Sequence, residues 1–143
     1  MTFDYPEYHV EPSPAAPGKT SLYRPVVRVR MIGPKASRKI WALLDTGADE
    51  SYITDSLAKK LGVTPISDDR AIINSASGEM FAWYGILTLE ITDGDERHVL
   101  SMTVGVVPQD WSEMILGHLG FFEHFDATFS DMDRNVILTA RST

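Results

Sequence analysis

Short apolar segments separated by turn-forming residues most constrain the fold of this chain. Apolar and polar side chains alternate with a period of two over residues 26–31 and again over residues 100–106, which is typical of half-buried strands. Residues 40–44 are apolar throughout, as expected for a strand that is buried on both faces. Turn signals such as Gly33-Pro34 and Asp93-Gly94 follow at short intervals,. The pattern predicts an all-β domain, either a closed barrel or a sandwich.

One or two short helices are expected between these strands. Thr54 can cap a helix in which Leu57 and Leu61 lie one turn apart, and Gly62 can end it,. Apolar side chains at helical spacing predict a second short helix over residues 118–124,. Neither segment is long enough to change the all-β class.

A long β-hairpin is predicted over residues 71–87, with its tip near Gly78,. Its second arm alternates so that Phe81, Trp83 and the apolar residues that follow at every second position share one face,. Trp83 and the adjacent Tyr84 have two interpretations. Aromatic side chains on a strand usually pack in a core, but both could instead line a groove.

Size and charge narrow the class of protein. The chain has 143 residues, of which 43% are hydrophobic, which suits one folded domain with a sizeable core. Its net charge of −7 argues against a partner that binds through phosphate contacts, because such proteins carry a concentrated basic face. Residues 1–20 hold four of the eight prolines and are predicted to be a flexible N-terminal arm, followed by a domain over residues 21–143.

The absence of cysteine bears on compartment and chemistry. The sequence contains none, which excludes disulfides and a thiol nucleophile and suits a reducing compartment. No run approaches the ~20 apolar residues of a membrane span, and residues 1–7 lack the basic and apolar regions of a signal peptide,. We therefore expect a cytoplasmic protein with no membrane partner.

The most informative motif is Asp45-Thr46-Gly47, which directly follows the apolar run at residues 40–44. A carboxylate beside a buried strand is costly unless it is exposed, hydrogen-bonded or paired with a group that changes its protonation. One interpretation is a capped tight turn, in which Asp45 and Thr46 bind local amides. The other is a site of acid–base chemistry.

The motif and its surroundings resemble the retropepsin-like, or retroviral-type, aspartic proteases. Residues 41–51 (Trp-Ala-Leu-Leu-Asp-Thr-Gly-Ala-Asp-Glu-Ser) are similar to the active-site strand and loop of this family. Residues 71–87 are similar to its flap hairpin, and residues 114–117 (Met-Ile-Leu-Gly) resemble its apolar-apolar-Gly signature. The resemblance implies a closed acid-protease β-barrel with one lobe per chain, and an endopeptidase that needs no cofactor and acts on peptide or protein substrates.

The resemblance also implies roles for individual residues. Asp45 would be the catalytic carboxylate, and a chain with a single Asp-Thr-Gly would have to form a homodimer to supply two of them. Thr46 would hold the two active-site loops together, and Gly47 would offer its carbonyl to the substrate.

Substrate-binding roles follow in the same way. Ala48 and Asp49 would line the groove, and Ser77 and Gly78 would close over the peptide from the tip of the flap. An alternative that the sequence leaves open is a peptide-binding or dimerisation module of the same fold with weak or no catalytic activity.

Two features depart from the family pattern. The flap tip has fewer glycines than is usual in retroviral members, and His118 stands where those members usually place an arginine that pairs with the acid equivalent to Asp49. We therefore hypothesise a His118–Asp49 pair, although a half-exposed histidine at a helix start explains the residue equally well. No metal site is predicted, because His118, His124 and Asp126 lack the spacing that brings ligands to one helix face,.

Overall fold

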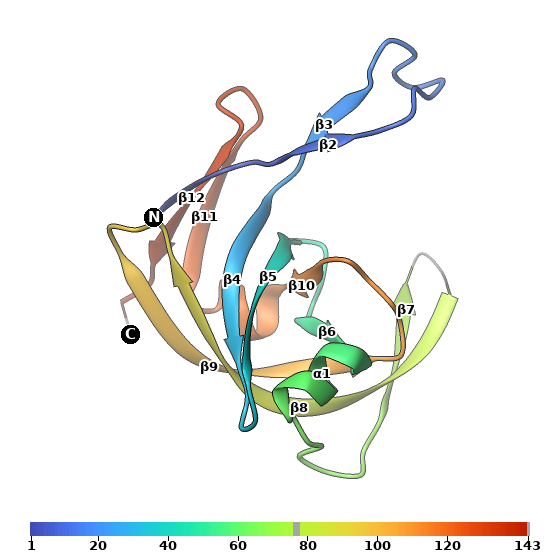
Figure 1. The fold of residues 1–143 in the computed structure, drawn as a ribbon, viewed down its shortest axis with the longest axis vertical. Coiled ribbons are helices and arrows are strands. Elements are labelled where there is room, and N and C mark those ends of the chain that lie inside the picture. The colour runs from blue at the N-terminus through green and yellow to red at the C-terminus, as the bar shows by residue number, and fades with distance from the viewer. Residues whose placement is uncertain (76–77, 143) are drawn as a thin grey trace.

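The computed structural model describes residues 1–75 and 78–142, and Figure 1 shows a twisted arrangement of strands with little helix. The strands are β1 (Thr2–Asp4), β2 (Glu7–His9), β3 (Ser21–Tyr23), β4 (Val26–Ile32), β5 (Ser37–Leu44), β6 (Tyr52–Thr54), β7 (Ala71–Ser75), β8 (Gly78–Thr92), β9 (Arg97–Val107), β10 (Met114–Leu116), β11 (Phe125–Ser130) and β12 (Asn135–Ala140). The helical segments are α1 (Asp55–Leu61) and the single turn η1 (His118–Phe122). The predicted all-β class is confirmed.

The main sheet has the strand order β4-β5-β10-β6-β9-β8-β7, and β4 also pairs with β8. Six strands therefore follow one another in a ring of pairings. Most neighbours are antiparallel, but β10 runs parallel to β5 and β6 runs parallel to β9. Because parallel neighbours end at the same edge of a sheet, the chain leaves β5 beside the point where it leaves β10.

The interior follows the predicted alternation on β4, where Val27, Val29 and Met31 are buried. The expectation that residues 40–44 are buried on both faces is wrong in part, because the Trp41 side chain is 39% exposed. On this face of β5 the ring is covered only in part, by a side chain of the neighbouring strand β4. The Arg28 guanidinium lies 5.3 Å from the ring centroid of Trp41, a cation–π arrangement that tolerates partial exposure.

The β7–β8 hairpin is confirmed, with Ser75 opposite Gly78 at its tip. The single apolar face predicted for its second arm is wrong at Phe81, which is 63% exposed, whereas Met80 and Ala82 are buried. From Gly85 onward β8 buries the opposite set of positions. The change of face has a physical cause. The first part of β8 pairs with β7 and packs in a separate small cluster, while the remainder belongs to the main core.

The α1 helix forms as predicted. The Thr54 hydroxyl accepts a hydrogen bond from the amide of Leu57 at 3.2 Å, and Gly62 ends the helix with φ = 79°,. The second helix is shorter than predicted, because Leu119 and Gly120 have non-helical backbone angles. Gly120 has φ = 95° and packs so closely that a Cβ atom there would lie 3.3 Å from the Ser51 hydroxyl.

Residues 1–20, predicted to be a flexible arm, make several pairings with the rest of the chain. β1 pairs with β12, and β2 pairs with β3 to form a hairpin that projects from the body (Figure 1). Arg134 lies over the Tyr23 ring of this hairpin at 3.9 Å from the centroid. The mobility of the segment and the boundary at residue 20 stay predictions. None of the helices in the described ranges is both long enough and apolar enough to cross a bilayer.

Candidate active site

The Asp45 loop begins where two parallel strands end side by side. Leu44 of β5 lies opposite Leu116 of β10, and the amide of Asp45 donates a hydrogen bond to the carbonyl of Leu116 at 3.0 Å. Asp45 therefore directly follows a segment whose backbone is hydrogen-bonded to β10. This pairing fixes the point on the sheet from which the Asp45 side chain projects.

The Asp45 side chain is held by its own loop. Its Oδ1 atom accepts a hydrogen bond from the amide of Gly47 at 2.9 Å. A Cβ atom at Gly47 would lie 3.2 Å from the same Oδ1, so a larger residue would crowd the carboxylate. This hydrogen bond from the Gly47 amide is compatible with both interpretations of the motif, a capped tight turn and a site of acid–base chemistry. Each of them requires an oriented and solvated carboxylate.

A buried serine and a glycine fasten the loop from behind. The Ser51 hydroxyl, in a side chain only 1% exposed, donates to the carbonyl of Leu119 at 2.9 Å and accepts from the amide of Gly117 at 3.0 Å. A Cβ atom at Gly117 would lie 2.6 Å from the Ala48 carbonyl oxygen and closer still to that of Glu50. This close approach explains why glycine follows the β10 strand.

The segment after Gly117 holds the loop from its other side. The amides of His118 and Leu119 donate to the carbonyls of Ala48 and Asp49 at 3.0 and 2.8 Å. The His118 ring does not form the hypothesised ion pair with the Asp49 carboxylate. Its Nε2 atom instead lies 2.6 Å from the carbonyl oxygen of Thr46, which makes Nε2 the protonated donor. The backbone bonds of His118 and Leu119 place the ring above the turn, within reach of this carbonyl.

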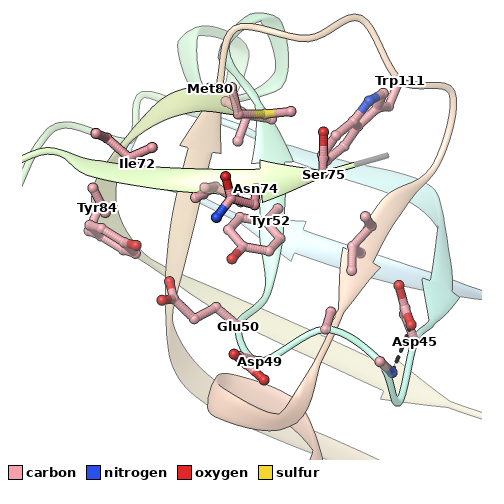
Figure 2. Close-up of a pocket in the computed structure, with 16 residues that line it drawn as sticks. Asp45, Asp49, Glu50, Tyr52, Ile72, Asn74, Ser75, Met80, Tyr84 and Trp111 are labelled. Carbon is pink, nitrogen blue, oxygen red and sulfur yellow. Dashed lines mark hydrogen bonds between the residues drawn. The ribbon is translucent and has the colours of Figure 1, made fainter. Parts of the chain in front are cut away.

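A groove of about 880 Å³ opens between this loop and the β7–β8 hairpin. Asp45 and residues 47–50 form one wall, and β7 with Met80 forms the other. Figure 2 shows Asp45 at one end of the groove and Glu50 at the other, with Asp49 beside it. Such a concave space, partly apolar and carrying a few polar groups, is typical of a binding site.

The residues singled out in the sequence lie in and around this groove. Asp45, Gly47, Ala48 and Asp49 line it, whereas Thr46 is exposed beside it and contributes its carbonyl to the His118 contact. Gly78 lies at the hairpin tip, where its carbonyl accepts a hydrogen bond from the Ser75 hydroxyl at 3.0 Å, and it is not part of the lining. Ser77 lies outside the described residues.

Several lining residues were not anticipated as site residues, among them Glu50, Tyr52 and Trp111. Of the two aromatics with open interpretations, Tyr84 lines the groove and Trp83 packs against the main core. Glu50 lies within residues 41–51, the segment that resembles the active-site strand and loop of the family, and this position is the signal that could have marked it. Tyr52 and Trp111 carry no comparable local signal.

Two phenols in the groove stay protonated far above neutral pH. Burial raises the pKa of Tyr52 to about 12, and the charges of Glu50 and Asp49 add to the effect,. The pKa of Tyr84 is also raised, first by burial and then by the nearby Glu50 carboxylate. These hydroxyls therefore act as neutral hydrogen-bonding groups at the Glu50 end of the groove. Within residues 1–75 and 78–142, no three His, Asp or Glu side chains are grouped so that they could hold a metal ion.

Comparison with known proteins identifies the family of the chain. The sequence profile of the aspartyl protease family matches residues 27–119, which is more than half of the 143-residue chain. The chain therefore belongs to the aspartyl protease family. Comparison with curated protein sequences gave no match.

Two solved structures are similar to the chain. A retropepsin-like aspartic protease from Rickettsia conorii has 18% sequence identity and a TM-score of 0.53, over 92% of this chain and 98% of that chain. EIAV protease, solved in complex with the inhibitor HBY-793, has 22% identity and a TM-score of 0.48, over 66% of this chain and 82% of that chain. At these identities the likeness to the Rickettsia protein concerns the fold, and it confirms the predicted retropepsin-like architecture.

Proposed function

We propose that the chain is an aspartic endopeptidase that hydrolyses peptide bonds between two Asp45 carboxylates, one from each subunit of a homodimer. The observation that carries this proposal is the position of Asp45, oriented by the Gly47 amide on the wall of a groove of about 880 Å³ beneath a β-hairpin. Membership of the aspartyl protease family supports the same chemistry.

A second copy is invoked because acid–base hydrolysis needs one ionised and one protonated carboxyl group close together. The chain contains a single Asp-Thr-Gly, and the other groove acids, Asp49 and Glu50, lie at the far end from Asp45 (Figure 2). Thr46 and Gly47 are exposed, so this turn is open to contact with a partner. A two-fold axis there would bring the two Asp45 side chains together.

The reaction then proceeds by balanced proton transfers. The ionised Asp45 takes a proton from water as the water oxygen bonds to the substrate carbonyl carbon, and Asp45 of the partner subunit protonates the carbonyl oxygen. When the C–N bond of the resulting diol breaks, the leaving nitrogen takes the proton from the first carboxyl group. The second carboxylate regains a proton from a diol hydroxyl, which restores the starting state.

Neighbouring residues have supporting roles in this proposal. Thr46 would contact its counterpart across the dimer axis, and the carbonyl of Gly47 would bind the substrate backbone. Ala48 and Asp49, both in the groove wall, would contact the bound peptide. Gly78, at the hairpin tip with φ = 109°, would let the hairpin close over it and exclude water.

The test is cleavage of a mixed peptide library between pH 4 and 7 at several protein concentrations. We expect Asp45→Asn to lower cleavage by at least about 1000-fold, since in a homodimer it replaces both carboxyl groups of the essential acid–base pair. Asp95→Asn is the matched control, because Asp95 is exposed in the turn between β8 and β9, far from the groove (Figure 1). Specific activity should rise with concentration, as dimerisation requires.

Cleavage that survives Asp45→Asn would contradict the proposed chemistry. Specific activity that is independent of concentration, together with a monomeric mass by sedimentation, would contradict the dimer. Peptide binding without any Asp45-dependent cleavage would identify the chain as a binding module of the same fold.

A further inference from the structure

A second cavity of about 410 Å³ adjoins the groove at the Glu50 end. Glu50 and Tyr84 line both spaces, so the groove and the cavity meet at these two side chains. The far side of the cavity is formed by β9 residues and by residues 119–124, including Glu123. Its size lies within the roughly 300–1,000 Å³ of typical ligand cavities, which leaves room for one long side chain of a bound peptide.

The Glu50 carboxylate is only partly satisfied where the two spaces meet, although the Tyr84 hydroxyl forms a hydrogen bond with it. Its Oε2 atom is buried and has no hydrogen-bond partner among the described residues. A buried polar atom without a partner is costly, and a charged one more so. Figure 2 shows the Glu50 side chain extending toward Tyr84 at the end of the groove, so a group entering there would meet this carboxylate and would reach the buried Oε2 atom once the side chain turns.

The surroundings of Glu50 favour a positively charged group. Glu123 carries a second carboxylate on the cavity wall, and its Oε1 accepts a hydrogen bond from the amide of Gly120 at 2.6 Å, which fixes it in place. Asp49 lies beside Glu50 in the groove, and His124 is the single imidazole in the cavity lining. None of the described residues that line the two spaces is a lysine or an arginine.

We propose that Glu50 and Glu123 form a specificity site for a lysine or arginine side chain of the bound peptide. A guanidinium or ammonium group would donate to the unpaired Glu50 oxygen and would be attracted by both carboxylates. In an extended peptide successive side chains point to opposite sides, so one residue of the substrate can reach into the cavity while its backbone stays in the groove. The inference rests on the proposed function only in treating the groove as a peptide-binding site.

The test compares arginine with citrulline, which has nearly the same shape and no charge. A positional-scanning set of fluorescein-labelled octapeptides carries arginine, citrulline or norleucine at one position at a time. Binding to the Asp45→Asn variant is measured by fluorescence anisotropy, and cleavage by the unchanged chain is measured as kcat/KM. At one position we expect arginine to be favoured over citrulline by about 10-fold or more, as for a charge-assisted hydrogen bond.

Glu50→Gln keeps the size of the side chain and removes its charge, so it should reduce this preference to about 2-fold or less. Glu123→Gln should reduce it in part and provides a second variant if Glu50→Gln fails to fold. Glu11→Gln, an identical change at an exposed position outside both spaces, should leave the preference intact. Higher salt should weaken it.

Two results would overturn the inference. One is equal binding of arginine and citrulline peptides at every position, and the other is an arginine preference that survives both glutamine substitutions. The binding measurement needs no turnover, so loss of the proposed catalytic function would not prevent this test. Conversely, Asp45-dependent cleavage without an arginine preference would reject the specificity site and leave the proposed function standing.

Discussion

Replacement of Ser51 by alanine tests whether one buried hydroxyl holds the candidate active-site loop in place. The hydroxyl joins two chain segments, because it accepts from the amide of Gly117 and donates to the carbonyl of Leu119. Ser51→Ala leaves a buried donor unpaired, which costs about 1–3 kcal/mol, and removes a partly buried bond worth about 0.5–1.5 kcal/mol. We expect the free energy of unfolding to fall by about 2–4 kcal/mol.

This loss is large compared with the total stability of about 5–15 kcal/mol that is usual for a domain. For a chain of this length it corresponds to a fall in Tm of roughly 7–13 °C. The assay is urea unfolding followed by tryptophan fluorescence, with the free energy extrapolated to zero denaturant. Measurements at two protein concentrations separate unfolding from dissociation of a dimer.

Ser56→Ala is the matched control for this change. Ser56 is exposed on the α1 helix, where the same substitution should change stability by no more than about 0.5 kcal/mol. If Ser51→Ala costs less than about 1 kcal/mol, the two hydrogen bonds do not hold the loop and the reasoning is refuted.

Two further perturbations address the close approach behind the loop and the phenols in the groove. Gly117→Ala should cost about 3 kcal/mol or more in the same urea assay, because the new Cβ would collide with backbone oxygens of the loop,; a cost no greater than that of Gly18→Ala, which has open space around it, would contradict this. For Tyr52, whose pKa is raised to about 12 in the folded chain, the unfolded phenol ionises first, near its ordinary value of 10. Stability from this group is therefore complete below pH 10 and is lost as pH rises toward 12. Tyr52→Phe should make the decline of the urea midpoint over this range shallower, and a slope equal to that of the unchanged chain would exclude the effect.

Local patterns predicted much of the architecture. Alternation on β4, the Thr54 cap and the Gly62 stop each depend on residues within a few positions of one another, and the structure contains all three. The β7–β8 hairpin was predicted for the same reason, since turn formers lie between two apolar arms. The resemblance at residues 41–51 implied that Ala48 and Asp49 line a groove, and both lie in the groove wall.

The failures of prediction occur where a distant segment determines the environment. Phe81 obeys the alternation of its strand, but the hairpin leaves the main core, so the buried face changes within β8. The His118 ring was expected to pair with Asp49, yet backbone bonds from the neighbouring segment bring it to the carbonyl of Thr46. Neither outcome can be derived from side-chain spacing within one element.

The sequence by itself determined the all-β class, the position of α1 and the acidic turn after β5, because each is set by contacts between residues close in the chain. Only the tertiary structure decided that Glu50 and Tyr84 line two adjoining cavities, and that Glu123 lines one of them. The physical reason is that strand pairing between distant segments, such as β6 with β9 and β5 with β10, sets which side chains meet. Hydrogen bonds between residues 66 and 72 positions apart then hold that arrangement in place, one donated by the Gly117 amide to Ser51 and one by the His118 ring to the Thr46 carbonyl.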